Sequence, residues 1–213
     1  MSQDKKDISE KHPYKKETHL IHGKFRSRKW DYNHHVIPPL TSSTTFRLDT
    51  SHRGAQGFFE FACDQSASKR KVPIYIYDRL DEPTRGMLEE NLAFAEGSDI
   101  CVTFASGMAA VAAALLTTLK AGDEVLANEI LYGCTYSLLT NWFPRLGIKV
   151  RFANLTSPGY ETAITEKTRA VYFESPLNPN LRLVDIPALQ KVVARWNEGR
   201  GEDEKVVTII DNT

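Results

Sequence analysis

The sequence predicts an α/β protein whose mostly parallel sheet is flanked by helices. From Pro83 onward, short β-branched runs alternate with segments of helical length, which is typical of crossover units in a parallel sheet. Polar side chains follow several of the predicted strands, and in open α/β sheets ligands bind beyond the carboxyl ends of strands. Residues 1–75 lack this regularity and are expected to form an extended arm with a loop insertion. Residues 76–213 are expected to form a partial α/β domain.

The first confident helix is predicted over Pro83–Glu96. Asp81 and Glu82 lie at its positive end, Pro83 suits a first turn, and Gly97 suits the stop. The segment Ser51–Val72 mixes Gly, aromatic, Ser and basic residues and is expected to be a long loop. Strands are predicted, in chain order, over Ile100–Phe104, Glu124–Ala127, Ile148–Phe152, Ala170–Phe173 and Val206–Ile210. Further helices are predicted over Gly107–Leu119, Thr135–Arg145, Tyr160–Thr165 and Ile186–Trp196, and a charged surface loop over Glu198–Lys205.

The bulk composition excludes several classes of protein. Lys plus Arg and Asp plus Glu both total 27 in the 213 residues, so charge gives no support to a nucleic-acid or anionic-membrane partner. The longest apolar stretch, Met108–Leu116, is too short to span a bilayer, and Met1–Lys16 shows no signal peptide. The three cysteines are widely spaced, which favours reduced thiols in a cytoplasm over a disulfide framework.

Two segments are candidate anion sites. Ser106, Gly107 and Met108 join a predicted strand directly to a helix, where backbone N–H groups and the helix dipole favour a phosphate. A tight, well-packed turn would explain the same residues. Tyr77 and Arg79 supply a hydroxyl and a planar guanidinium suited to phosphate, although both also suit an ordinary surface. The sequence has neither a Gly-x-Gly-x-x-Gly fingerprint nor a Walker loop, which argues against a nucleotide-binding module.

Four further candidates follow predicted strands. Tyr132 can stack on a flat ring and take part in proton transfer, or it can plug its loop against the core. Cys134 would line the same mouth unless it is a buried thiol. Asn178 lies in a Pro-rich turn after the strand ending at Phe173, and Asp211 directly follows the last strand. Because strand carboxyl ends meet at one edge of a parallel sheet, we expect these side chains to gather there.

Four of the six histidines form two pairs, His19 with His22 and His34 with His35. Neither pair is joined by a Cys or carboxylate cluster at ligand spacing. The sequence therefore predicts no metal site.

Together these segments closely resemble the trans-sulfuration (cysteine and methionine metabolism) family of pyridoxal-phosphate enzymes, which includes methionine γ-lyase, cystathionine γ-lyase and cystathionine γ-synthase. The likeness runs from about Tyr14 to the last residue. It depends on six segments in the right order: Thr18-His19-Leu20-Ile21-His22-Gly23, Tyr77-Asp78-Arg79 with Pro83-Thr84, Ser106-Gly107-Met108-Ala109-Ala110, Leu131-Tyr132-Gly133-Cys134-Thr135, Glu174-Ser175-Pro176 with Asn178-Pro179-Asn180, and Asp211-Asn212-Thr213.

The resemblance implies a fold-type I large domain and the cofactor pyridoxal 5'-phosphate (PLP). Gly107 and Met108 would bind its phosphate through backbone amides, and Tyr77 and Arg79 would reach the phosphate of a neighbouring subunit. Tyr132 would stack on the pyridine ring and assist proton transfer. The resemblance further implies that Asn178 hydrogen-bonds the ring hydroxyl, that Asp211 pairs with the ring nitrogen, and that Cys134 lies near the substrate.

The implied function is elimination or replacement at Cγ or Cβ of sulfur amino acids or activated homoserine, in a cytoplasmic homotetramer built as a dimer of dimers. The family's Schiff-base lysine is expected on the order of 25 residues beyond Asp211, so this chain would be an N-terminal portion that is inactive alone. Glu82 stands where the family usually has Asn. An alternative is a split or degenerate subunit that binds cofactor or a partner without catalysis of its own.

Overall fold

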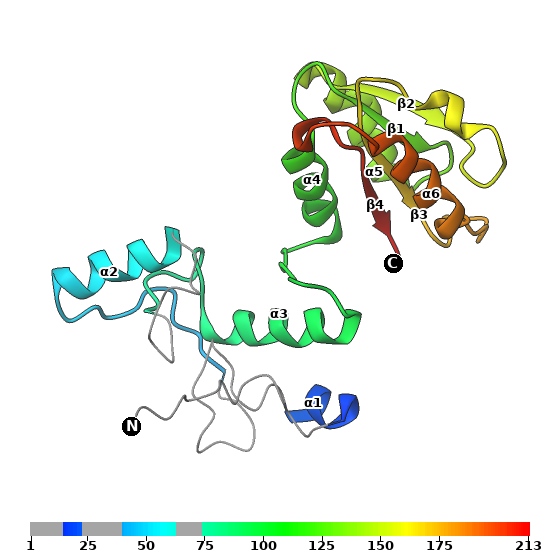
Figure 1. The fold of residues 1–213 in the computed structure, drawn as a ribbon. Coiled ribbons are helices and arrows are strands. Elements are labelled where there is room, and N and C mark those ends of the chain that lie inside the picture. The colour runs from blue at the N-terminus through cyan, green and yellow to red at the C-terminus, as the bar shows by residue number, and fades with distance from the viewer. Residues whose placement is uncertain (1–14, 23–39, 63–73) are drawn as a thin grey trace, which may run out of the picture. The chain divides into compact units, whose positions relative to one another are not determined.

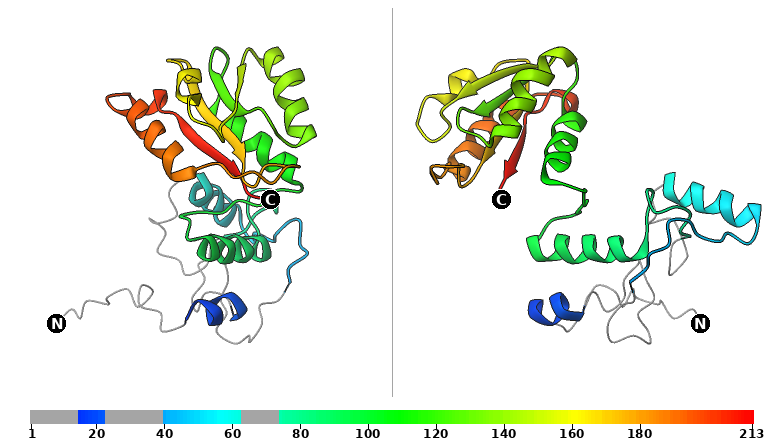
Figure 2. Two further views of the ribbon diagram at one scale, coloured as in Figure 1. Left: turned by 90° about the vertical axis from the view of Figure 1, so that its right-hand side faces the viewer. Right: turned by 180° about the vertical axis from the view of Figure 1, so that it is seen from behind.

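The computed structural model describes residues 15–22, 40–62 and 74–213 of the chain. Two compact units make up the protein, Met1–Thr103 and Phe104–Thr213. Figures 1 and 2 show the helices and strands within each unit. The division of the chain at residue 75 into an arm and a domain stays a prediction.

The first unit contains the predicted helix over Pro83–Glu96, labelled α3, with the expected bounds. The Glu82 carboxylate accepts hydrogen bonds from the backbone N–H groups of Thr84, at 2.9 Å, and Arg85. Gly97 ends the helix with φ of 67°, a left-handed conformation that glycine adopts without steric cost. The sequence signals were correct here because they are local: a capping carboxylate, a proline in the first turn and a glycine after the last.

The prediction of a loop over Ser51–Val72 is wrong for its first half, because Ser51–Ala62 forms helix α2. Gly54 and Gly57 lie three residues apart and are both buried. A Cβ atom at Gly57 would lie 2.9 Å from Cγ2 of Ile74, and one at Gly54 would lie 3.0 Å from Cδ1 of Leu48. The glycines therefore permit close packing of the helix, which outweighs their low helix propensity.

The strand predicted over Ile100–Phe104 is also wrong, because these residues are irregular. The Thr103 backbone N–H and hydroxyl both donate to Oε1 of Glu89, each at 2.9 Å. Ile100 is 77% exposed. A β-branched run becomes a strand only when another strand satisfies its backbone groups, and none does so here among the described residues.

The second unit contains a four-stranded, fully parallel sheet in the order β2-β1-β3-β4. The strands span Glu124–Asn128 (β1), Lys149–Ala153 (β2), Thr168–Glu174 (β3) and Val207–Asp211 (β4). These four predictions are confirmed to within one or two residues. The β1 and β3 strands lie at the centre, and β1 is buried along its whole length, as expected where helices cover both faces.

Helices flank the two faces of this sheet (Figure 2). One face packs against α4, Gly107–Thr118, and against a helical segment that begins as α5, Gly133–Ser137, and continues as a π turn and a 3-10 turn to Leu146. The other face packs against α6, Ile186–Asn197. The short 3-10 turns η5 and η6 cover Tyr160–Ala163 and Glu202–Glu204. The predicted α/β architecture is confirmed, and in the described ranges no helix is long and apolar enough to cross a membrane.

Candidate functional site

The connections that leave β1 and β3 run in opposite directions across the sheet. From β1 the chain passes through α5 to β2, and from β3 it passes through α6 to β4. Because β1 and β3 are neighbours, the two connections diverge between them. Such a divergence leaves a crevice at the carboxyl ends of the strands, the usual ligand position in open α/β sheets.

A buried carboxylate joins the two loops at this divergence. Glu174 is the last residue of β3 and is 4% exposed. Its Oε1 accepts the backbone N–H of Tyr132 at 2.5 Å, and its Oε2 accepts the backbone N–H of Asn178 at 3.2 Å. The structure therefore brings together the loops that carry two of the predicted site residues, while the side chains of both remain exposed.

The amino end of α4 offers unpaired backbone donors. Ser106 caps this helix, because its Oγ accepts the N–H of Ala109 at 3.2 Å and its carbonyl accepts that of Ala110. In the described part of the chain, the N–H groups of Gly107 and Met108 have no acceptor. A Cβ atom at Gly107 would meet no heavy atom within 4 Å. These two amides thus lie at the positive end of a helix dipole, with open space beside Gly107, an arrangement that can bind phosphate groups.

A relay of side-chain contacts runs from the start of α4 to the end of β4. Thr135 Oγ1 lies 3.5 Å from Sδ of Met108, and interaction with the Thr135 side chain lowers the pKa of the Tyr172 phenol. The Tyr172 hydroxyl donates to Oδ2 of Asp211 at 3.3 Å. Met108 and Asp211, two predicted site residues that are 103 positions apart in the sequence, therefore belong to one connected cluster.

Tyr172 is the fully buried centre of that relay. Burial raises its pKa far above the ordinary value of 10.0. Interaction with the Thr135 side chain lowers the pKa by a smaller amount, and the negative charges of Asp211 and Glu174 raise it further. The phenol therefore stays neutral across the physiological range and remains a hydrogen-bond donor to the carboxylate of Asp211. The second oxygen of that carboxylate, Oδ1, accepts from the backbone N–H and hydroxyl of Thr213.

Tyr132 and Cys134 lie side by side at the mouth of the first loop. The Cys134 thiol is 3.3 Å from the Tyr132 hydroxyl, and contact with this thiol raises the pKa of Tyr132. Both side chains are exposed, which contradicts the alternatives of a plugged loop and of a buried thiol. Exposure leaves the Tyr132 ring free for stacking.

Tyr77 and Arg79 belong to the first unit, whereas the other candidates belong to the second. The Arg79 guanidinium lies over the Tyr77 ring at 5.1 Å from its centroid. Arg85 fixes the turn between them, because its guanidinium donates to the backbone carbonyl of Asp78 at 2.6 Å. The turn presents an exposed cation beside a half-buried phenol.

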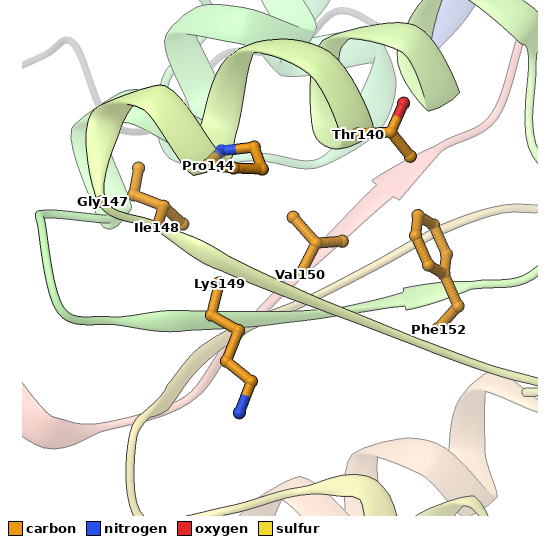
Figure 3. Close-up of a pocket in the computed structure, with 7 residues that line it drawn as sticks. All are labelled: Thr140, Pro144, Gly147, Ile148, Lys149, Val150 and Phe152. Atoms are coloured by element: carbon orange, nitrogen blue, oxygen red, sulfur yellow. The ribbon is translucent and has the colours of Figure 1, made fainter.

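A separate hollow of about 500 Å³ lies between β2 and the helical segment that ends at Leu146 (Figure 3). Thr140, Pro144, Val150 and Phe152 line it, whereas the Lys149 amine points away. None of the predicted site residues borders this space. Within the described residues no cluster of His, Cys, Asp or Glu side chains could hold a metal, and His34, His35 and Cys63 lie outside those residues.

Sequence reasoning missed Tyr172 and noted Thr135 and Glu174 only as parts of motifs. Strand alternation could have pointed to Tyr172, because it lies two residues before Glu174 and so shares its face of the sheet. The register of β3 and β4 pairs Glu174 with Asp211. That pairing is not visible in the sequence.

Comparisons with known proteins give a consistent set of relatives. The family model described as "Cys/Met metabolism PLP-dependent enzyme" matches residues 17–213. The chain is 36% identical over 179 residues to L-methionine gamma-lyase of Pseudomonas deceptionensis, covering 84% of this chain and 41% of that protein. It is 42% identical over 139 residues to O-acetyl-L-homoserine sulfhydrylase of Leptospira meyeri, covering 65% of this chain and 30% of that protein.

Solved structures agree with these sequence relatives. A putative O-acetylhomoserine (thiol)-lyase from Campylobacter jejuni, which carries a pyridoxyl-lysine monophosphate, superposes with a TM-score of 0.75 at 28% identity. The match covers 94% of this chain and 44% of that one. A cystathionine gamma-lyase from Lactobacillus plantarum gives a TM-score of 0.72 at 27% identity, over 94% of this chain and 45% of that one. The chain thus spans less than half the length of these relatives.

Proposed function

Since the chain belongs to the Cys/Met metabolism family of PLP-dependent enzymes, we propose that it contributes to elimination or replacement at Cγ, or at Cβ, of sulfur amino acids or activated homoserine. The family membership expected from six sequence motifs is confirmed. The reaction and the substrates are proposals, because the chain spans 41% of the length of the methionine gamma-lyase that it matches.

The phosphate of PLP would bind at the start of α4. The N–H groups of Gly107 and Met108 are unpaired among the described residues, and the space beside Gly107 is open. Ser106 holds this turn in shape by capping the helix. Tyr77 and Arg79 of a neighbouring subunit would donate hydrogen bonds to the same phosphate from a hydroxyl and a guanidinium. The exposure of Arg79 supports this role.

The ring of PLP would be held by three side chains from three strand ends. Tyr132 would stack on it, Asn178 would donate to its hydroxyl, and Asp211 would pair with its nitrogen. A carboxylate beside that nitrogen favours its protonated form. When bound in this state, the ring supplies a sink for the electrons left by removal of the substrate α-proton. Tyr132 would move protons near the leaving group, with its raised pKa keeping the phenol in the protonated form.

The single observation that carries this proposal is the relay from Met108 through Thr135 and Tyr172 to Asp211. It connects the phosphate-binding helix start with the carboxylate meant for the ring nitrogen, on one face of one sheet. We further propose that none of this chain's lysines forms the Schiff base. The Nζ atoms of Lys149 and Lys205 form ion pairs with the carboxylates of Glu124, at 3.1 Å, and Glu202, at 2.5 Å.

Direct binding of PLP to the purified protein tests the proposal. The wild type should bind PLP, and Asp211→Asn should weaken binding at least tenfold because a charge pair is lost, about 1.4 kcal/mol or more. Asp203→Asn is the matched control, since Asp203 is an exposed carboxylate in the η6 turn. Absence of binding, or equal affinity in wild type and Asp211→Asn, would refute the cofactor site. Borohydride reduction that attaches PLP to a lysine of this chain would refute the Schiff-base proposal.

A second candidate is a subunit that binds cofactor but needs another polypeptide for catalysis. Release of keto acid only after mixing with the complementary half of a family member would support it. A cytoplasmic location and a dimer of dimers are proposed from the family alone.

A further inference from the structure

Glu174 is a carboxylate in an unusual position for a charged side chain. It is the last residue of the central strand β3, is 4% exposed, and lies opposite Asp211 in the register of β3 and β4. Across the described ranges, no lysine, arginine or histidine forms an ion pair with it. A buried carboxylate without a cationic partner is costly unless backbone donors satisfy it.

Two backbone donors do satisfy Glu174, and they come from different loops. Oε1 accepts the N–H of Tyr132 at 2.5 Å, across 42 residues of sequence, and Oε2 accepts the N–H of Asn178 at 3.2 Å. Each oxygen is thus committed to one loop. The carboxylate holds the start of α5 and the turn after β3 at a fixed separation, where the connections from β1 and β3 diverge.

The first of these loops meets Glu174 at the backbone of Tyr132. Tyr132 occupies the cap position of α5, and its side chain caps none of the backbone N–H groups of that helix. Its own carbonyl accepts the N–H of Tyr136 in the first helical turn, and its side chain is 45% exposed. The hydrogen bond to Glu174 ties the backbone N–H of Tyr132 directly to the end of β3, beside Ile130 and Leu131, which pack against the sheet.

We propose that Glu174 is a positioning residue that sets the separation of Tyr132 and Asn178 and so orients both toward the PLP ring. It touches neither cofactor nor substrate and acts only through the two backbone amides. Glutamine has nearly the same shape but only one acceptor oxygen. In Glu174→Gln one of the two N–H groups therefore faces an NH₂ group and loses its partner. The inference rests on the proposed PLP site.

Amide spectroscopy tests the positioning without any cofactor. The full chain is labelled with ¹⁵N-tyrosine and ¹⁵N-asparagine, and the amides of Tyr132 and Asn178 are followed in wild type, Glu174→Gln and Glu129→Gln. Glu129 is the control, because it is an exposed glutamate just after β1. In Glu174→Gln, the resonance of at least one of the two amide protons should move upfield, and that proton should exchange faster with solvent. In Glu129→Gln neither amide should change. Unchanged amides in Glu174→Gln would overturn the proposal.

PLP affinity of the same three proteins separates this inference from the proposed function. We expect about tenfold weaker binding in Glu174→Gln, because the two loops are no longer held in position before the cofactor binds, and no change in Glu129→Gln. Displaced amides with wild-type affinity would refute the positioning role while leaving the PLP site in place. A wild type that binds no PLP would refute the proposed function and this inference with it. If Glu174→Gln fails to fold, Glu174→Asp serves instead. In Glu174→Asp we expect shifted resonances for both amides and a PLP affinity between that of the wild type and that expected for Glu174→Gln.

Discussion

Replacing Tyr172 with phenylalanine tests whether the buried relay exists as described. The phenylalanine ring occupies the same space among Leu115, Val125 and Leu139, so the change removes the hydroxyl and little else. That hydroxyl donates to Asp211 at 3.3 Å. A hydrogen bond to a charged group contributes about 1.5 to 3 kcal/mol, and the long distance favours about 1.5 kcal/mol near pH 7.

The pH dependence of this loss follows from the raised pKa of Tyr172. A raised pKa means that the folded phenol keeps its proton where the unfolded one has lost it. Its contribution to stability is therefore complete below the ordinary value of 10.0 and falls as the pH rises above it. The slope is about 1.4 kcal/mol per pH unit for one proton. At about pH 11 the free energy of unfolding of the wild type should thus be about 1.4 kcal/mol lower than near pH 7 because of this phenol. Tyr172→Phe has no phenol at this position and should not show that decrease.

Urea unfolding followed by fluorescence near pH 7 and at about pH 11 measures both effects. The free-energy gap between wild type and Tyr172→Phe should be about 1.5 kcal/mol near pH 7 and close to zero at the higher pH. Tyr136→Phe is the control for removal of a phenol, since Tyr136 is 47% exposed. A gap that is the same at both pH values would show that the phenol of Tyr172 is not buried against negative charge, and the relay would be wrong.

Three further changes test the fold and the mouth of the site. Burial alone would raise the pKa of Glu124, but hydrogen bonds from two basic side chains and a threonine lower it overall. Glu124→Gln should therefore lower the free energy of unfolding by about 1 to 2 kcal/mol near pH 7. In urea titrations this stability difference between wild type and variant should shrink as the pH falls through the low folded-state pKa of Glu124, and a constant difference would contradict the prediction. Gly57→Ala should destabilise the first unit by about 1 kcal/mol despite alanine's higher helix propensity, because the new Cβ would lie 2.9 Å from Ile74; a rise in the urea midpoint would show that α2 does not pack this closely. Cys134→Ala should return the raised pKa of Tyr132 toward its ordinary value in a ¹³C-tyrosine titration, since contact with the thiol is the largest cause of the shift; an unchanged titration would exclude that contact.

The sequence alone determined the features that local chemistry controls. Helix α3 has its predicted bounds because Glu82, Pro83 and Gly97 each act on the residues beside them. The four strands of the sheet follow short apolar runs, and the Ser106 cap follows from one hydroxyl at a strand–helix junction. The same local segments carried the family resemblance, so the cofactor class was also within reach.

Only the tertiary structure decided the features that depend on distant partners. Ile100–Phe104 has the composition of a strand but lacks a pairing partner among the described residues. Ser51–Ala62 is helical, and its buried glycines pack closely against residues such as Ile74. The hydrogen bond from Tyr132 to Glu174 joins residues 42 positions apart in the sequence, and the hydrogen bond from Tyr172 to Asp211 joins residues 39 positions apart. Such contacts depend on strand order and register, which fix which side chains meet at the carboxyl edge of the sheet. No local pattern encodes them, because each partner alone is compatible with many other surroundings.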